Sequence, residues 1–156
     1  MPVRVDEARF EQCSRVAGVA IAAYTMRAME RWRSTLADYD SVMIMVAVIA
    51  IGSERLLRAD LPEEYRTLAV PLEPGTAGKV NVAGIAHATG LNRETARRKV
   101  NALIERGQLV RDQDGSVSFP PGLSQSSRIR DQARAQLGEI AMVAEQLERM
   151  GVLVRE

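Results

Sequence analysis

The chain has 156 residues, of which 46% are hydrophobic and 26% are charged. This size and composition are those of an ordinary globular domain and exclude wholesale disorder. Aromatic residues make up only 4%, while Ala, Val, Leu and Met are plentiful, which favours helices over a β-sandwich. Cys13 and His87 are the only residues of their types, which excludes a disulfide framework, a zinc site built on cysteines or histidines, and a histidine dyad. We expect no metal and no cofactor.

No segment has the pattern of a membrane span or an export signal. The longest apolar run, residues 42–51, is half of the roughly 20 residues that a helix needs to cross a bilayer. The N-terminus carries Asp6, Glu7 and Glu11 before its first long apolar stretch, which is wrong for a signal peptide. We therefore expect a cytoplasmic protein without a membrane partner.

The formal net charge of +1 hides a basic block at residues 79–111. This block holds seven Lys and Arg against two acidic residues, whereas acidic residues are in slight excess on both sides of it. Such a block is typical of an element that binds a polyanion. Because charged runs on helices are usually just solvated faces, the pattern inside the block must decide between the two interpretations.

The N-terminal third predicts two helices. The first runs from about residue 6 to 36 and is apolar on nearly every face over 16–29, so something besides its own small domain must cover it. The second apolar run, 42–57, would suit a buried strand through its β-branched residues, but its length and charged continuation favour a helix. Pro62 then begins a short helical turn through Tyr65 and Leu68, and the prolines and glycines of 71–78 predict a loop.

The basic block predicts two short helices joined by a glycine turn. A brief strand over 79–82 leads into a helix over 83–89, for which Asn81 is the N-cap and Gly90 the end. Asn92 caps the next helix, 93–106, and Gly107 follows it.

Two β-prone segments, 109–111 and 116–119, follow the second helix of the block. They predict a β-hairpin that turns at Asp114-Gly115.

The C-terminal part predicts one long helix over 126–150, closed by Gly151. Its apolar positions step by four and three residues, which predicts a seam that packs along another helix; they are Ala133, Leu137, Ile140, Ala144 and Leu147. Since one small domain cannot cover both this seam and the apolar first helix, we expect a homodimer formed by both ends of the chain.

Residues 79–119 resemble the DNA-binding part of bacterial winged helix–turn–helix transcription regulators. Residues 92–98, with the sequence Asn-Arg-Glu-Thr-Ala-Arg-Arg, are similar to the start of the recognition helix in the Crp/Fnr and GntR families. A central winged helix between terminal helices resembles the architecture of the MarR family. The resemblance implies a mainly α fold with a small β-wing and with dimerisation helices at both ends. It also implies four regions: N-terminal helices at 1–60, a linker at 61–78, the winged helix–turn–helix at 79–122 and a dimerisation helix at 123–156.

In this motif the N-terminal part of the second helix contacts base edges. Ala96, Val100 and Leu103 repeat at helical spacing and face the core, so other side chains of the helix face the groove. We expect base contacts from Arg93, Glu94, Thr95 and Arg98, because Arg binds guanine through two hydrogen bonds and Glu accepts one from cytosine. The alternative for Glu94 and Arg98 is a simple ion pair between residues four positions apart.

A second group of polar side chains is suited to phosphates, which position the protein without reading sequence. These candidates are Lys79, Asn92, Arg97, Lys99, Asn101, Arg106 and Arg111. Asn92 also serves as a helix cap.

We therefore expect a sequence-specific transcription regulator that binds double-stranded DNA as a homodimer. The alternative is a winged helix used as a protein-interaction module, with a basic helix that is merely solvated. An enzyme ranks third, because Glu63 and Glu64 have no nucleophile, histidine or phosphate-binding loop nearby in the sequence. The sequence leaves open whether a small-molecule effector binds. We expect Cys13 to be an apolar helix residue rather than a redox sensor, and the methionines, including Met26, Met29, Met43 and Met45, to lie in the core.

Overall fold

The structure is a computed structural model that describes residues 2–58, 62–72 and 76–155. It divides into two compact units, one formed by Met1–Trp32 with Asp131–Glu156 and the other by Arg33–Arg130. The fold is mainly helical, as predicted, with two small antiparallel strand pairs. The division differs from the predicted regions, because the second helix belongs to the same unit as the two helices that follow it and packs with them.

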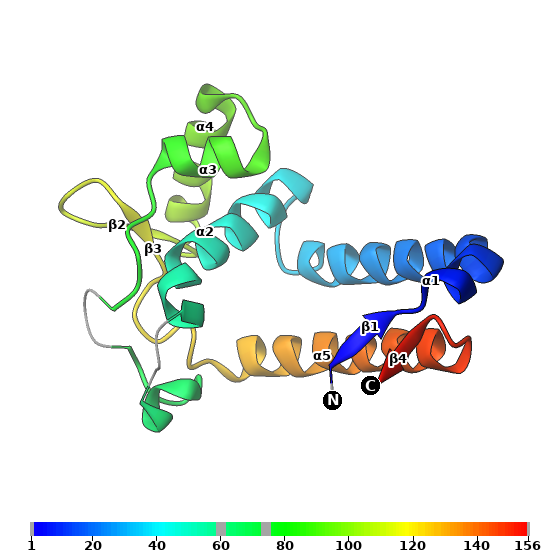
Figure 1. The fold of residues 1–156 in the computed structure, drawn as a ribbon. Coiled ribbons are helices and arrows are strands. Elements are labelled where there is room, and N and C mark those ends of the chain that lie inside the picture. The colour runs from blue at the N-terminus through cyan, green and yellow to red at the C-terminus, as the bar shows by residue number, and fades with distance from the viewer. Residues whose placement is uncertain (1, 59–61, 73–75, 156) are drawn as a thin grey trace. The chain divides into compact units, whose positions relative to one another are not determined.

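The unit Arg33–Arg130 is built on three helices, α2 (Tyr39–Arg58), α3 (Val82–Thr89) and α4 (Arg93–Glu105), which pack against one another (Figure 1). Residues 42–51 are thus helical and not a strand. A 3-10 helix, η1 (Glu63–Arg66), follows α2 and is shorter than the predicted turn. Part of the predicted linker, residues 61 and 73–75, lies outside the described residues. The buried core holds Ile44, Met45, Val48, Val80, Ile85, Val100, Leu103, Leu109 and Val117.

The two predicted helices of the basic block are confirmed to within one residue at each end, because the caps form as expected. The Asn81 side chain accepts a hydrogen bond from the Gly84 amide, and the Asn92 side chain accepts one from the Thr95 amide, both at 2.8 Å. Gly90 and Gly107 follow α3 and α4 with φ values of 71° and 68°, a left-handed conformation that favours glycine. Each of these four boundaries thus depends on a local side-chain or backbone conformation.

A hairpin of two short strands, β2 (Val110–Arg111) and β3 (Val117–Ser118), follows α4. The Gly115 amide donates to the Asp112 carbonyl at 2.9 Å, and Gly115 itself has φ 82°. The turn is therefore centred one residue before the predicted Asp114-Gly115, because the left-handed glycine takes the last position of a three-residue loop. Of the strand predicted at 79–82, only Val80 pairs, as a single bridge to Val117.

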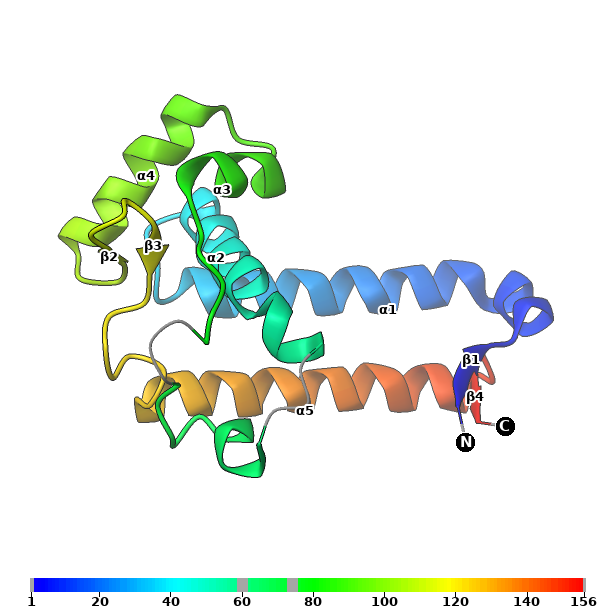
Figure 2. The ribbon, with the colours of Figure 1, turned by 60° about the vertical axis from the view of Figure 1, so that its left-hand side comes forward.

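The other unit contains most of two long antiparallel helices, α1 (Glu7–Arg33) and α5 (Ser127–Arg149) (Figure 2). Arg33 and residues 127–130 at the ends of these helices belong to the unit Arg33–Arg130. Two strands that the sequence did not predict, β1 (Val3–Val5) and β4 (Leu153–Arg155), pair antiparallel at one end of these helices. Beside them Ala17, Leu147 and Val152 are buried. Cys13 packs half-buried against this cluster, as expected for an apolar helix residue.

Polar side chains join α1 and α5 further along. Glu139 is 6% exposed, and its carboxylate is paired with Arg31, with Arg27 at 3.7 Å. The Trp32 indole donates to the Gln136 side chain at 3.1 Å. These contacts turn the face of α5 that carries Gln136 and Glu139 toward α1.

The predicted apolar seam of α5 is therefore not the face that the chain itself buries. Leu147 is buried, but Leu137 and Ile140 are 65% and 42% exposed. The expectation that the methionines form core is also wrong in part, since Met26 and Met43 are exposed while Met45 is buried.

Among the described residues, no helix combines the length and the apolar character that crossing a membrane requires.

Candidate functional site

An open cleft of about 640 Å³ lies on the unit Arg33–Arg130, between the beginning of α3, one face of α4 and the hairpin. Three arginines line it, together with two asparagines and backbone from α3 and the hairpin. Its lining residues are Asn81, Val82, Ala83, Arg93, Arg97, Asn101, Arg111 and Gly115. No carboxylate belongs to the lining, so the cleft is electropositive.

The helix α4 supplies the long wall of the cleft. Arg93, Arg97 and Asn101 are spaced four residues apart and therefore share one face of the helix. The adjacent face, about a quarter of a turn around the helix, packs into the core through Ala96, Val100 and Leu103, which are at most 1% exposed. The apolar periodicity that the sequence shows thus directs the arginines outward.

Arg111 connects α4 to the hairpin. Its guanidinium donates to the Asn101 side chain at 3.0 Å and to the Gly115 carbonyl at 3.1 Å. Since Arg111 lies on β2, these bonds place its positive charge at the edge shared by helix and hairpin. Three donors of a guanidinium remain after two are used, so Arg111 can still bind an anion in the cleft.

The beginning of α3 closes the cleft on the third side. Asn81 satisfies the Gly84 amide, but the first amides of a helix have no acceptor within the helix and carry a partial positive charge. Val82 and Ala83 provide these amides and both line the cleft. Sequence reasoning missed this contribution, although the predicted cap at Asn81 already located the start of the helix.

Glu94 reduces the charge of one arginine. Its carboxylate accepts two hydrogen bonds from Arg97, at 2.6 and 3.0 Å. The hydrogen bonds from Arg97 lower the pKa of Glu94 below its usual value. The predicted alternative pairing of Glu94 with Arg98 does not occur, because the carboxylate turns to the residue three positions away.

The predicted base-reading residues are divided between the cleft and its surroundings. Arg93 lines the cleft, whereas Glu94 and Arg98 are exposed beside it and Thr95 is half-buried. Within the described parts of the chain, neither Arg93 nor Arg98 has a hydrogen-bonding or ion-pairing partner. Both guanidiniums are thus available to an anion or a base.

The predicted phosphate-binding residues are divided in the same way. Arg97, Asn101 and Arg111 line the cleft, while Asn92 is exposed and caps α4. Arg106 is exposed at the other end of α4. Lys99 does not line the cleft: its side chain is 22% exposed, and its ammonium donates to Asp38 at 2.5 Å, with Asp40 at 3.9 Å. It lies on the side of α4 that faces the N-terminus of α2, so its charge is used within the unit.

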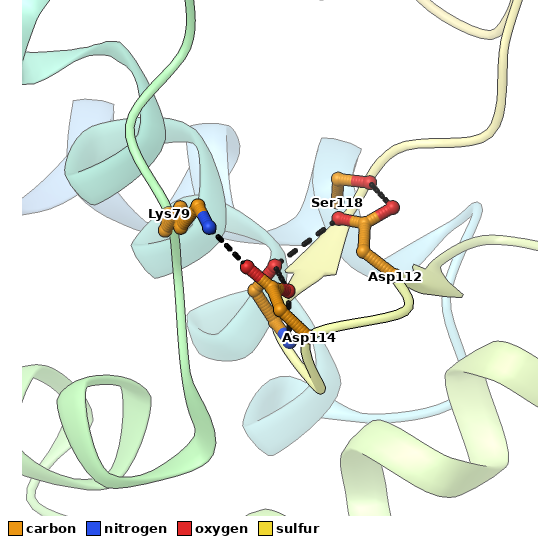
Figure 3. Close-up of polar contacts among 5 residues, drawn as sticks. Lys79, Asp112, Asp114 and Ser118 are labelled. Carbon is orange, nitrogen blue, oxygen red and sulfur yellow. Dashed lines mark hydrogen bonds and ion pairs between the residues drawn. The ribbon is translucent and has the colours of Figure 1, made fainter. Parts of the chain in front are cut away.

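Lys79 contacts the hairpin and not the cleft (Figure 3). Its ammonium donates to Asp114, whose carboxylate also accepts from the amide and the hydroxyl of Ser116. These bonds, with that from Lys79 the strongest, hold the pKa of Asp114 far below its usual range. Asp112 accepts from Ser118 at 3.2 Å in the same group. The hairpin turn is therefore acidic, and it pairs with Lys79, one of the residues predicted to contact phosphate.

Comparisons of the chain with protein-family models, with curated proteins and with solved structures found no match.

Proposed function

We propose that the protein binds double-stranded DNA as a sequence-specific transcription regulator, through a winged helix–turn–helix formed by α3, α4 and the β2–β3 hairpin. The observation that carries the proposal is the cleft, which is lined by Arg93, Arg97 and Arg111 together with the first residues of α3. Three guanidiniums and a helix N-terminus are the donors that bind phosphates most effectively. In this motif the second helix enters the major groove, and α4 presents its N-terminal Arg93, Glu94 and Arg98 outward.

The acting form in this proposal is a homodimer in the cytoplasm. The exposed apolar residues of α1 and α5 support a partner of the same kind, because single soluble units rarely leave so many large apolar side chains in water. They are Val16, Val19, Ile21, Met26, Leu137, Ile140 and Met142.

The test is the salt dependence of duplex binding. For the wild-type protein we expect the logarithm of the binding constant to fall steeply and linearly with the logarithm of the salt concentration, because phosphate contacts release counterions. Replacing Arg93, Arg97 or Arg111 by Ala should lower the slope by about one for each protomer. Arg15→Ala, which removes an exposed arginine of the other unit, is the matched control and should leave the slope unchanged. A flat salt response of the wild type would overturn the proposal.

The second candidate is a protein-interaction module of the same fold. It is favoured by one observation, since Arg97 is already paired with Glu94 on its own helix and needs no external anion. A protein that fails to bind any duplex at low salt, while remaining folded, would favour this candidate.

A further inference from the structure

One exposed face of α5 combines small and charged residues in a way that contacts within the described part of the chain do not explain. Arg134, Gly138, Ala141 and Glu145 are spaced by four, three and four residues, so they form one line along the helix, which we call the α5 seam. All four are exposed. The buried residues of α5, Glu139 and Leu147, lie on a different face.

The centre and the ends of the α5 seam lack partners. Glycine is the least favourable residue in a helix interior after proline, and a Cβ added at Gly138 would meet no atom within 4 Å. Close packing within the described chain therefore does not require this glycine. In the described part of the chain, neither Arg134 nor Glu145 forms a hydrogen bond or an ion pair.

The α5 seam is complementary to itself in the antiparallel direction. Arg134 and Glu145 lie equally far from the midpoint between residues 139 and 140, and so do Gly138 and Ala141. In two antiparallel helices related by a twofold axis at this midpoint, each seam residue of one copy faces the seam residue of the second copy that lies equally far from the midpoint on its other side. Arg134 of one copy then faces Glu145 of the second copy at both ends, and the two smallest residues face each other in the middle. Small residues allow helix axes to approach closely.

The apolar residues beside the α5 seam have the same symmetry. Leu137 and Met142 are 65% and 58% exposed, flank the seam on opposite sides and are also equally far from the midpoint. In the antiparallel pair each therefore lies beside its own counterpart. The contact would have a small, close centre, two apolar edges and an ion pair at each end.

We propose that two copies of the chain dimerise by packing their α5 helices antiparallel along the α5 seam, with Arg134 of each copy paired with Glu145 of the other. This inference rests on the homodimer of the proposed function and names the face and the residues that form it. We infer that a second copy occupies the α5 seam, because the charges of the seam are complementary to the same seam running in the opposite direction. An unrelated partner would not be expected to carry this pattern.

The test is a charge reversal followed by sedimentation velocity of the full chain over a range of concentrations. Arg134→Glu places two acidic residues together at each end, and Glu145→Arg places two basic ones there. Because like charges held together in an interface are strongly unfavourable, each single variant should raise the dimer dissociation constant at least about tenfold. The double variant restores opposite charges and should return to within about threefold of the wild type. Arg128→Glu, an exposed residue a third of a turn around the same helix, is the matched control and should leave dimerisation unchanged.

A second variant tests the centre of the contact. Gly138→Leu adds bulk where the chain has open space, so helix content by circular dichroism should be kept or raised while the dimer is lost. Dimers that persist in both single charge variants and in Gly138→Leu would overturn the inference, as would a double variant that stays monomeric. Salt-dependent duplex binding is measured on the same samples. If the variants still bind the duplex in a salt-dependent way and still dimerise like the wild type, the inference about the α5 seam fails while the proposed DNA binding stands.

Discussion

Arg97 and Lys99 are two residues apart on α4, yet their charges have different surroundings. Arg97 is exposed at the cleft, whereas Lys99 points toward the beginning of α2 and binds Asp38. Asp38 also accepts a hydrogen bond from the Ser41 amide at 2.9 Å, so one carboxylate connects the first turn of α2 with α4. The pair therefore contributes to the packing of two helices.

Replacing Asp38 by Asn should remove the charge while keeping the bond to the Ser41 amide. Partial burial disfavours the charged carboxylate, but the hydrogen bonds from Lys99 and Ser41 outweigh it and lower the pKa of Asp38 in the folded state. A lowered pKa stabilises the fold above the unfolded-state pKa, and this contribution is lost as the pH falls below about 4.

Urea denaturation over a series of pH values measures the effect. At pH 7 we expect Asp38→Asn to lower the free energy of unfolding by about 1 kcal/mol. The difference between wild type and variant should shrink below pH 4. A difference that stays constant down to the acid limit would show that the Asp38 charge is not involved. Asp131→Asn, at an exposed position of α5, is the control.

The proposed recognition of bases also depends on single residues. Arg98 is exposed, has no hydrogen-bonded partner among the described residues and lies one turn beyond Glu94 on the outward side of α4. Because a bidentate arginine contact discriminates between bases by about 1–3 kcal/mol, Arg98→Ala should relax the preference at one position of each half-site. Non-specific affinity should fall much less. Selection of bound sequences from random duplexes measures both, and an unchanged preference in the folded variant would exclude Arg98 as a base-reading residue.

At the scale of elements, the hairpin differs from a simple basic wing. Asp112 and Asp114 lie in its turn, and Asp114 neutralises Lys79 from the segment before α3 (Figure 3). In the proposed complex these carboxylates lie near phosphates and repel them. The hairpin thus limits the affinity of a site whose other elements are basic.

Asp114→Asn should therefore raise duplex affinity. The variant removes a negative charge and frees Lys79, while its side-chain oxygen can still accept from the Ser116 amide. We expect non-specific affinity at low salt to rise roughly threefold and the salt slope to become steeper. Fluorescence anisotropy with a labelled duplex measures this change. An affinity that falls, in a variant with unchanged circular dichroism, would mean that the Lys79–Asp114 pair is needed to hold the hairpin in place.

The elements that sequence predicted correctly are those whose ends depend on neighbouring residues. Asn81, Asn92 and Gly107 define the limits of α3 and α4 through contacts within a few positions. The strands β1 and β4 were missed because each has only three residues and its partner lies at the other end of the chain. The role of Lys99 was missed for the same reason, since Asp38 is 61 positions away.

The sequence predicted an apolar seam on α5 but not the face that the chain itself buries, because periodicity shows where apolar residues gather and not which face finds a partner in the same chain. Glu139 and Gln136 are polar, and the sequence alone gives no reason to bury them. Their partners Arg31 and Trp32 lie on α1. Apolar positions such as Leu137 are left exposed as a result, and their exposure supports the proposed dimer.

At the scale of the whole molecule, the proposed DNA-binding cleft and the proposed dimer contact belong to different units of the chain. The cleft lies within Arg33–Arg130, and the α5 seam lies within the other unit. A twofold-symmetric dimer carries two copies of the cleft and should prefer a DNA site with matching symmetry. Each protomer then contributes one half-site, and the second contact becomes intramolecular once the first has formed.

This arrangement predicts bivalent binding. A duplex with two inverted half-sites about 10 base pairs apart should bind about 100-fold more tightly than a duplex with one, because the linked second contact benefits from a high effective concentration. Inserting about 5 base pairs between the half-sites rotates one of them by half a helical turn and should remove most of this gain. Arg134→Glu, which weakens the dimer, should bind both duplexes with the affinity of the single half-site. Anisotropy titrations of the three duplexes with wild type and variant measure these affinities. If the wild type binds one and two half-sites with equal affinity at every spacing, the two clefts of a dimer do not bind the same DNA molecule together.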